Sequence, residues 1–151
     1  MISRLWSTVL LFGALACGDT TSPSSPAAGD GTTASYRAPT RAGLFVVEAR
    51  PLPDPIPLNE PFHLDLRLFE ADGTSPVAGA QLEVDGWMEN HGHGMVRRSV
   101  VVEISPGRYE VRGMLFHMGG HWDLRVEASR VRLDGEYLAV ERDGTSFGVD
   151  L

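Results

Sequence analysis

From residue 43 onward, the sequence alternates apolar and polar side chains with a period of two. The clearest run spans residues 62–68, and residues 81–85 and 122–127 repeat the pattern. Because successive residues of a strand point to opposite faces, this alternation is typical of antiparallel strands with one buried face. No window shows the apolar periodicity of an amphipathic helix. Turn-forming pairs separate the runs: Asp72-Gly73, Pro106-Gly107, Gly119-Gly120, Asp134-Gly135 and Asp143-Gly144.

These patterns predict an all-β fold, an immunoglobulin-like antiparallel β-sandwich of seven to eight strands with Greek-key connections. The strands are expected near residues 44–49, 62–70, 80–88, 96–104, 108–116, 121–128, 131–133 with 136–142, and 146–150. The apolar positions of the alternation are assigned to the buried face. This assignment is specific, because a register shift of one residue would expose all of these side chains. The assigned side chains are Leu64, Leu66, Val84, Val101, Tyr109, Val111, Trp122, Leu124 and Val126.

The N-terminal residues have the composition of targeting and linker segments. Residues 1–17 resemble a secretory signal peptide, with Arg4 before an apolar run from Leu5 to Leu15. This run is shorter than the ~20 residues of a membrane-spanning helix. Cys17 lies where a lipobox places the lipidated cysteine, although an ordinary signal peptide with a chance cysteine is the alternative. Residues 18–42 are rich in Ser, Thr and Pro and are expected to form a disordered tether. The folded domain is therefore assigned to residues 43–151.

The overall charge and the motif content argue against two classes of function. The formal net charge is −7, and the chain has no lysine, so nucleic acid is an unfavourable partner. The single cysteine lies outside the predicted domain, and neither a G-x-S-x-G nor an H-E-x-x-H motif is present. We therefore expect a protein that is not an enzyme.

Four of the five histidines and four of the five methionines lie between Met88 and His121. Imidazole binds zinc, copper and nickel, whereas thioether sulfur adds affinity mainly for Cu(I), so the mixture favours a copper ion. A zinc site built from the histidines alone is the variant. Met88 and Met114 lie on predicted strands and are expected in the core, and His63 is expected on the surface. The candidate ligands are His91, His93, Met95, His117, Met118 and His121.

The two strands predicted between the histidine-containing segments run up and back, so residues 89–95 and 117–120 are expected at the same end of the sandwich. The alternative without a metal is a flexible polar loop at residues 91–95 and a β-turn that points Phe116 and Met118 into the core.

The motif M-x-x-H-G-H-G-M, followed by a strand pair and G-R-Y-E-V-x-G-M-L-F-H-M-G-G-H-W-D-L-R-V, resembles the YtkA-like domain, a bacterial exported module related to FixH proteins. The resemblance spans roughly Gly43 to Ala128. It implies an immunoglobulin-like sandwich, often a lipoprotein, often encoded among genes for copper handling or respiratory oxidase maturation. Its motif residues here are His91, Met95, Met118, Gly120 and Trp122.

Residues 130–151 lie outside the resemblance and are expected to form a closing hairpin. Two functions remain open. The first is an exported, lipid-anchored copper-binding module of the cell envelope that buffers or delivers the ion or serves oxidase maturation. The second is a metal-free immunoglobulin-like interaction domain that docks on another envelope protein.

Overall fold

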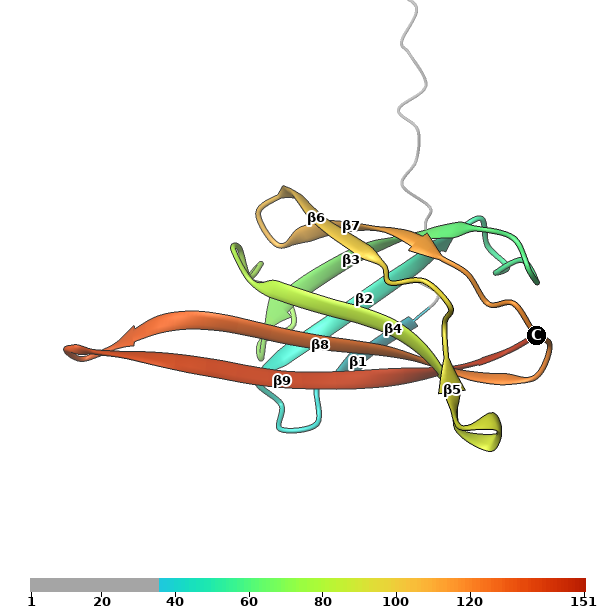
Figure 1. Cartoon of the computed structure of the whole chain (residues 1–151). Coiled ribbons are helices and arrows are strands. Elements are labelled where there is room, and N and C mark those ends of the chain that lie inside the picture. The colour runs from blue at the N-terminus through green and yellow to red at the C-terminus, as the bar shows by residue number, and fades with distance from the viewer. Residues whose placement is uncertain (1–35) are drawn as a thin grey trace, which may run out of the picture. The chain divides into compact units, whose positions relative to one another are not determined.

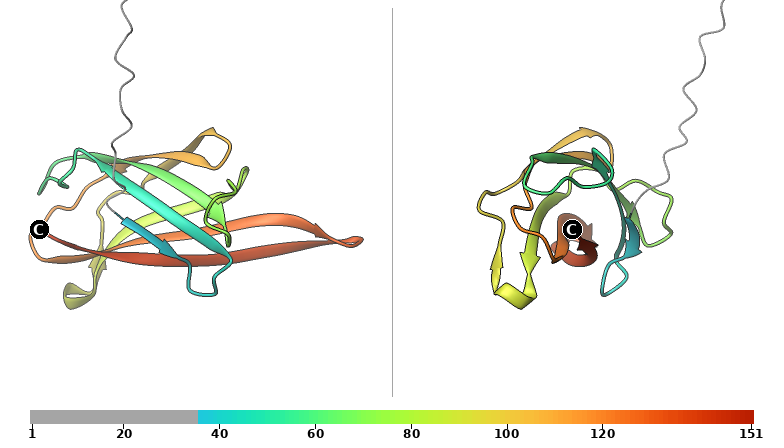
Figure 2. Two further views of the ribbon diagram at one scale, coloured as in Figure 1. Left: turned by 180° about the vertical axis from the view of Figure 1, so that it is seen from behind. Right: turned by 90° about the vertical axis from the view of Figure 1, so that its right-hand side faces the viewer.

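A computed structural model describes residues 36–151, which form two antiparallel β-sheets with no α-helix among these residues. The five-stranded sheet has the order β1 (Tyr36–Pro39), β2 (Phe45–Leu52), β3 (Phe62–Glu70), β7 (Arg108–Met114) and β6 (Val100–Ser105). The four-stranded sheet has the order β5 (His93–Gly94), β4 (Gln81–Met88), β8 (His121–Asp134) and β9 (Tyr137–Asp150). The two sheets are layered on each other, which confirms the predicted β-sandwich (Figure 1; Figure 2).

The predicted signal peptide, Cys17 and most of the predicted tether lie outside the described residues. Within residues 36–151, no helix has the length and apolar character needed to cross a membrane.

The ordered domain begins before residue 43, so the predicted C-terminal boundary of the tether at residue 42 is wrong. Residues 36–39 form β1, which pairs antiparallel with β2 in the register Tyr36 to Ala49. The centre of the Tyr36 ring lies 5.5 Å from the centre of the Phe147 ring on the opposite sheet. Both contacts join residues distant in sequence, and therefore the local composition of residues 36–42 carries no sign of them.

The largest differences between the other strands and the predictions are at two places. The strand expected over residues 96–104 begins only at Val100. The four segments expected after residue 121 are two strands of 14 residues each, β8 and β9, which pair along their whole length. The predicted closing hairpin is therefore the continuation of two core strands. It extends beyond the other strands of the sandwich (Figure 1).

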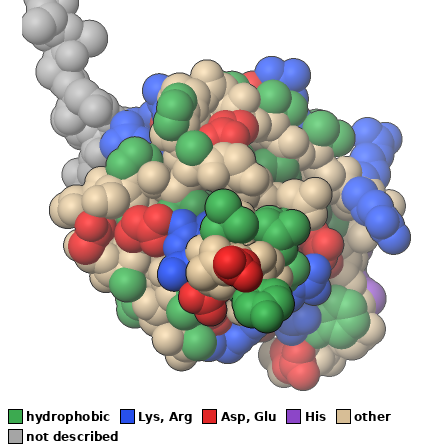
Figure 3. All heavy atoms as spheres, turned by 90° about the vertical axis from the view of Figure 1, so that its left-hand side faces the viewer, with side chains coloured by type: hydrophobic (Ala, Val, Ile, Leu, Met, Phe, Trp, Pro, Cys, Tyr) green, Lys and Arg blue, Asp and Glu red, His purple; other side chains and the backbone are tan. Residues whose placement is uncertain are grey.

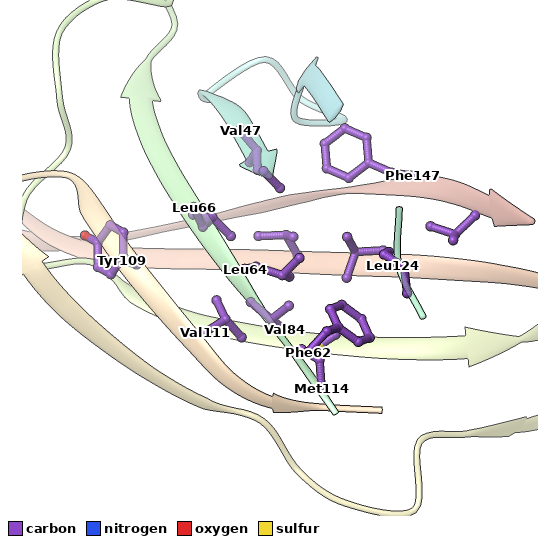
Figure 4. Packing of buried hydrophobic residues seen from close by; sticks show 14 of the residues in the cluster. Val47, Phe62, Leu64, Leu66, Val84, Tyr109, Val111, Met114, Leu124 and Phe147 are labelled. Atoms are coloured by element: carbon purple, nitrogen blue, oxygen red, sulfur yellow. The ribbon is translucent and has the colours of Figure 1, made fainter. Parts of the chain in front are cut away.

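The core lies between the sheets and contains the side chains that the alternation assigned to it (Figure 4). Eight of the nine predicted core residues are buried, and Val101 is only partly buried because it lies on the edge strand β6. Met88 and Met114 are fully buried and His63 is exposed, as expected. Complete burial of each large aliphatic side chain contributes about 1.5–3 kcal/mol to folding.

Candidate metal site

The two histidine-containing segments lie at the same end of the sandwich, opposite the tip of the β8–β9 hairpin, as predicted (Figure 1; Figure 2). The first segment contains the 3₁₀ turn η1 (Glu89–His91) and the short strand β5. The second is the connection from β7 to β8. Antiparallel strands β6 and β7 separate them in sequence, and this pair returns the chain to its starting end.

Local backbone geometry separates His91 from His93. Gly92 follows η1 in the left-handed conformation, with φ 66°, and its N–H donates to the carbonyl of Met88 over 2.9 Å. This conformation favours glycine because it has no Cβ. His93 then pairs with Met88, whose side chain is buried, and paired residues share a face of the sheet. The imidazole of His93 is therefore turned toward the inner face.

The imidazole rings of His91, His93 and His117 form a row with His93 in the middle. Its ring centre lies 5.7 Å from that of His91 and 5.4 Å from that of His117. The ring of the buried Trp122 lies edge-on to both His93, at 6.3 Å, and His117, at 5.5 Å. The indole N–H of Trp122 donates to the carbonyl of Met118 over 2.9 Å. Trp122 therefore forms an apolar wall beneath the histidines and holds the second segment in place.

Phe116 fixes the position of this wall. Its ring stacks on that of Trp122 with centres 4.6 Å apart and planes 8° apart, and it meets Phe62 edge-on at 5.1 Å. Phe116 occupies the space beside Gly86, where an added Cβ would lie only 2.3 Å from the Phe116 ring. An isolated glycine within a strand indicates a close approach of this kind, which is the sequence signal that identifies Gly86.

His117 carries an unsatisfied polar atom. Its Nδ1 is buried and has no hydrogen-bond partner in the described part of the chain. Leaving a buried polar atom unpaired is costly, so such atoms in native proteins call for a partner that completes their bonding. A metal ion is one such partner, because neutral imidazole nitrogen is a ligand.

The remaining predicted ligands are placed differently. Met95 lies opposite Gly86, to whose carbonyl its N–H donates over 3.0 Å, and its side chain packs against the core on the face that His93 shares. Met118 is 37% exposed, so the alternative that pointed it into the core is wrong for Met118 and correct for Phe116. Met118 therefore lies at the surface of the second segment.

The structure does not bring His121 to the row of imidazoles. Trp122 points inward, so its neighbour His121 points to the outer face, where its Nδ1 lies 2.7 Å from Oδ1 of Asp150. This hydrogen bond to the carboxylate is the main cause that raises the pKa of His121 above its ordinary value. His121 therefore belongs to an ion pair rather than to the candidate site.

A comparison with protein families finds one match, in which the model of the YtkA-like family matches residues 56–127. The chain therefore contains a YtkA-like domain. The matched residues include both histidine-containing segments and end before the outer half of the β8–β9 hairpin. Searches of curated proteins and of solved structures found no match.

On the outer face of the YtkA-like domain, a polar cluster supports the first histidine-containing segment. The indole N–H of Trp87 donates to Oε2 of Glu89 over 2.8 Å, and Arg125 contacts the same oxygen at 3.3 Å. The Arg125 guanidinium also lies over the Trp87 ring, 5.1 Å from its centre. The Glu89 carboxylate is thus used to anchor η1 to β8. Sequence reasoning missed this role because the three residues meet only through the β4–β8 pairing.

The spacing of the imidazoles in the YtkA-like domain suits a shared ion, although the nitrogens are not gathered around one point. With metal–nitrogen bonds of ~2.0–2.1 Å and tetrahedral to trigonal angles, two imidazoles on one ion have ring centres roughly 5–5.5 Å apart. The ring centres of His93 and His117 are 5.4 Å apart, within this range, and those of His91 and His93 are 5.7 Å apart, just above it. Among residues 36–151, no three His, Cys, Asp or Glu side chains are arranged as a preformed metal site. Metal binding here therefore requires the rings to rotate.

Proposed function

We propose that the YtkA-like domain is a copper-binding module of the cell envelope, exported and held at a membrane by a lipid on Cys17. Its role is to buffer or deliver the ion, or to serve oxidase maturation, and not to catalyse a reaction. His93 and His117 are the central ligands, and His91, Met95 and Met118 complete the donor set.

The row of imidazoles is the observation that carries this proposal. His93 lies within 5.7 Å, between ring centres, of both His91 and His117, and these residues come from segments separated by two strands. The unpaired, buried Nδ1 of His117 supplies a donor atom that nothing else in the described residues satisfies. Trp122 keeps the inner side of the row apolar, which strengthens electrostatic interactions there.

The chemistry of the donor set favours copper over zinc. Met95 and Met118 flank the histidines in the same two segments, and thioether sulfur is a soft donor that binds Cu(I) better than Zn(II). The described residues offer the row no thiolate, since the single cysteine is Cys17. A bound copper ion would supply a soft, exchangeable cation, and the residues of the site would hold and orient it.

A metal-free domain that docks on another envelope protein is the second candidate, and the outer face of β6 favours it. Val100, Val102 and Ile104 are 40–58% exposed on this edge strand. A contiguous row of exposed apolar side chains at a sheet edge is a typical protein contact surface.

An anaerobic competition titration against a Cu(I) chelator tests the proposal. The full chain is used with Cys17→Ser, because a free thiol binds Cu(I) on its own. The combined change of His93→Ala and His117→Ala is expected to weaken Cu(I) binding at least about 100-fold, since it removes two ligands at once. The matched control is His63→Ala with His121→Ala, which removes two exposed imidazoles outside the row and leaves the affinity unchanged.

Two further measurements complete this experiment. Met95→Leu is expected to weaken Cu(I) binding more than Zn(II) binding, because it removes only a soft donor. Binding is expected to weaken as pH falls, because imidazole must lose its proton to act as a ligand. If both histidine pairs have equal effects, or if the parent chain competes no better than the double variant, the copper proposal is refuted and the docking domain is the better explanation.

A further inference from the structure

The β8–β9 hairpin inverts the polarity of its two faces at the point where it leaves the sandwich. In the first half of β8, Trp122, Leu124, Val126 and Ala128 face the core, and their neighbours are polar. Beyond residue 129 the inner face is charged, since Arg130 and Arg132 both contact Glu141 across the hairpin. The aliphatic residues of the outer hairpin lie mainly on the outer face, whereas Tyr137 and Ala139 share the inner face with these charges.

Four aliphatic side chains make up this outer face, which we term the tip patch. Val131 pairs with Val140, and Leu133 pairs with Leu138, so the four side chains lie together on one side of the ribbon. They are between 63% and 72% exposed. Figure 3 looks onto the hairpin tip and shows hydrophobic side chains gathered there around acidic atoms. Exposed apolar patches of this kind mark contact sites.

Unpaired charges of opposite sign flank the tip patch. Arg142 lies on the same face toward the sandwich, and Glu136 lies in the turn at the tip. Neither has an ion-pair partner among the described residues. Along the chain the two are equally far from Ala139, which marks the middle of the patch.

We propose that the tip patch binds the tip patch of a second copy of this chain. When two hairpins stack face to face in opposite directions, the two-fold axis lies between the two patches, level with the middle of each. Each Arg142 then lies beside Glu136 of the other copy, and the four aliphatic side chains of each ribbon pack on those of the other. The surface is therefore complementary to itself in charge.

The size of the patch sets the strength of the dimer. Four aliphatic side chains and two charges cover much less than the ~800 Å² per partner of a standard stable interface. A weak, reversible dimer with a dissociation constant of about 0.1 mM is therefore expected. The acidic tip, with Asp134 and Glu136, disfavours the alternative of insertion into an anionic lipid surface.

Sedimentation velocity over a range of concentrations tests the proposal. The full chain carries Cys17→Ser, so that neither an attached lipid nor an intermolecular disulfide links two copies. The combined change of Leu133→Asn and Leu138→Asn is expected to weaken the dimer at least about tenfold, because it removes half of the apolar contact. Tyr137→Asn is the matched control, since Tyr137 is 78% exposed on the opposite face of the same hairpin and should change the dimer little.

A charge exchange tests the orientation. Arg142→Glu and Glu136→Arg are each expected to weaken the dimer about threefold, and the two changes together should restore it, because the pair reforms with its signs reversed. A chain that remains monomeric at about 0.5 mM would overturn the proposal. So would equal effects of the leucine changes and Tyr137→Asn. Binding to phosphatidylcholine vesicles that is lost with the leucine changes, from a chain that stays monomeric, would assign the patch to a lipid surface instead.

Discussion

Replacement of Gly86 by alanine is expected to destabilise the domain through the ring stack behind the histidines. The added Cβ would lie 2.3 Å from Cε1 of Phe116, closer than two carbon atoms can approach. The Phe116 ring cannot simply withdraw, because it is fully buried between Trp122, at 4.6 Å, and Phe62, at 5.1 Å. Either the ring stack or strand β4 must move.

The magnitude follows from two opposing effects. Overpacking of a rigid core costs about 1–3 kcal/mol. Alanine also restricts the unfolded chain, which offsets about 0.4–1 kcal/mol of this cost where the native backbone suits alanine. Gly86 meets that condition, because its φ is not in the left-handed region. The free energy of unfolding should therefore fall by about 1–2 kcal/mol, measured by urea unfolding. A shift of the ring stack would also displace Trp122, which forms the wall behind the histidines. Under the copper proposal, Gly86→Ala should therefore weaken Cu(I) binding as well.

Gly148 provides a matched control. An added Cβ there would lie 2.8 Å from Cε1 of His121, which is the end of a half-exposed side chain that can move aside. Gly148→Ala is therefore expected to change stability by less than about 0.5 kcal/mol or to raise it slightly. In a double-mutant cycle, Phe116→Leu should relieve about 1 kcal/mol of the cost of Gly86→Ala. If Gly86→Ala leaves stability unchanged, or if the cycle shows no coupling, the ring stack is not rigid and the reasoning fails.

Three further predictions concern the anchor, the core and the outer face. Cys17→Ser should release the protein into the soluble fraction of cells, and unchanged membrane association would contradict lipid anchoring. Trp122→Ala should lower the free energy of unfolding by about 3–5 kcal/mol in urea titrations, because the side chain is fully buried, and a loss below about 1 kcal/mol would be inconsistent with that burial. Asp150→Asn should lower the pKa of His121, followed by NMR titration, because the hydrogen bond to Asp150 raises it. The raised pKa means that the fold favours protonated His121. The pair therefore stabilises the fold fully at pH values below the ordinary histidine pKa of about 6.5, and this stabilisation is lost as the pH rises through the raised pKa of His121.

The alternation of apolar and polar residues determined most of the fold. It assigned Leu64, Leu66 and Val111 to the core and His63 to the surface, because which face a side chain takes depends only on its position along its own strand. The same rule separates His121 from the other histidines. If Trp122 points inward, its neighbour must point outward, so the sequence already contained the information that excludes His121 from the site.

Only the tertiary structure decided which residues meet across strands. The pairing of β4 with β8 brings Trp87 and Glu89 to Arg125, and the return of β7 brings His117 beside His93. Strand β1 likewise depends on distant partners, because Tyr36 is ordered by β2 and Phe147 rather than by its polar neighbours. Such contacts join residues far apart in the chain, and local periodicity records the face of each strand but not the identity of its neighbour.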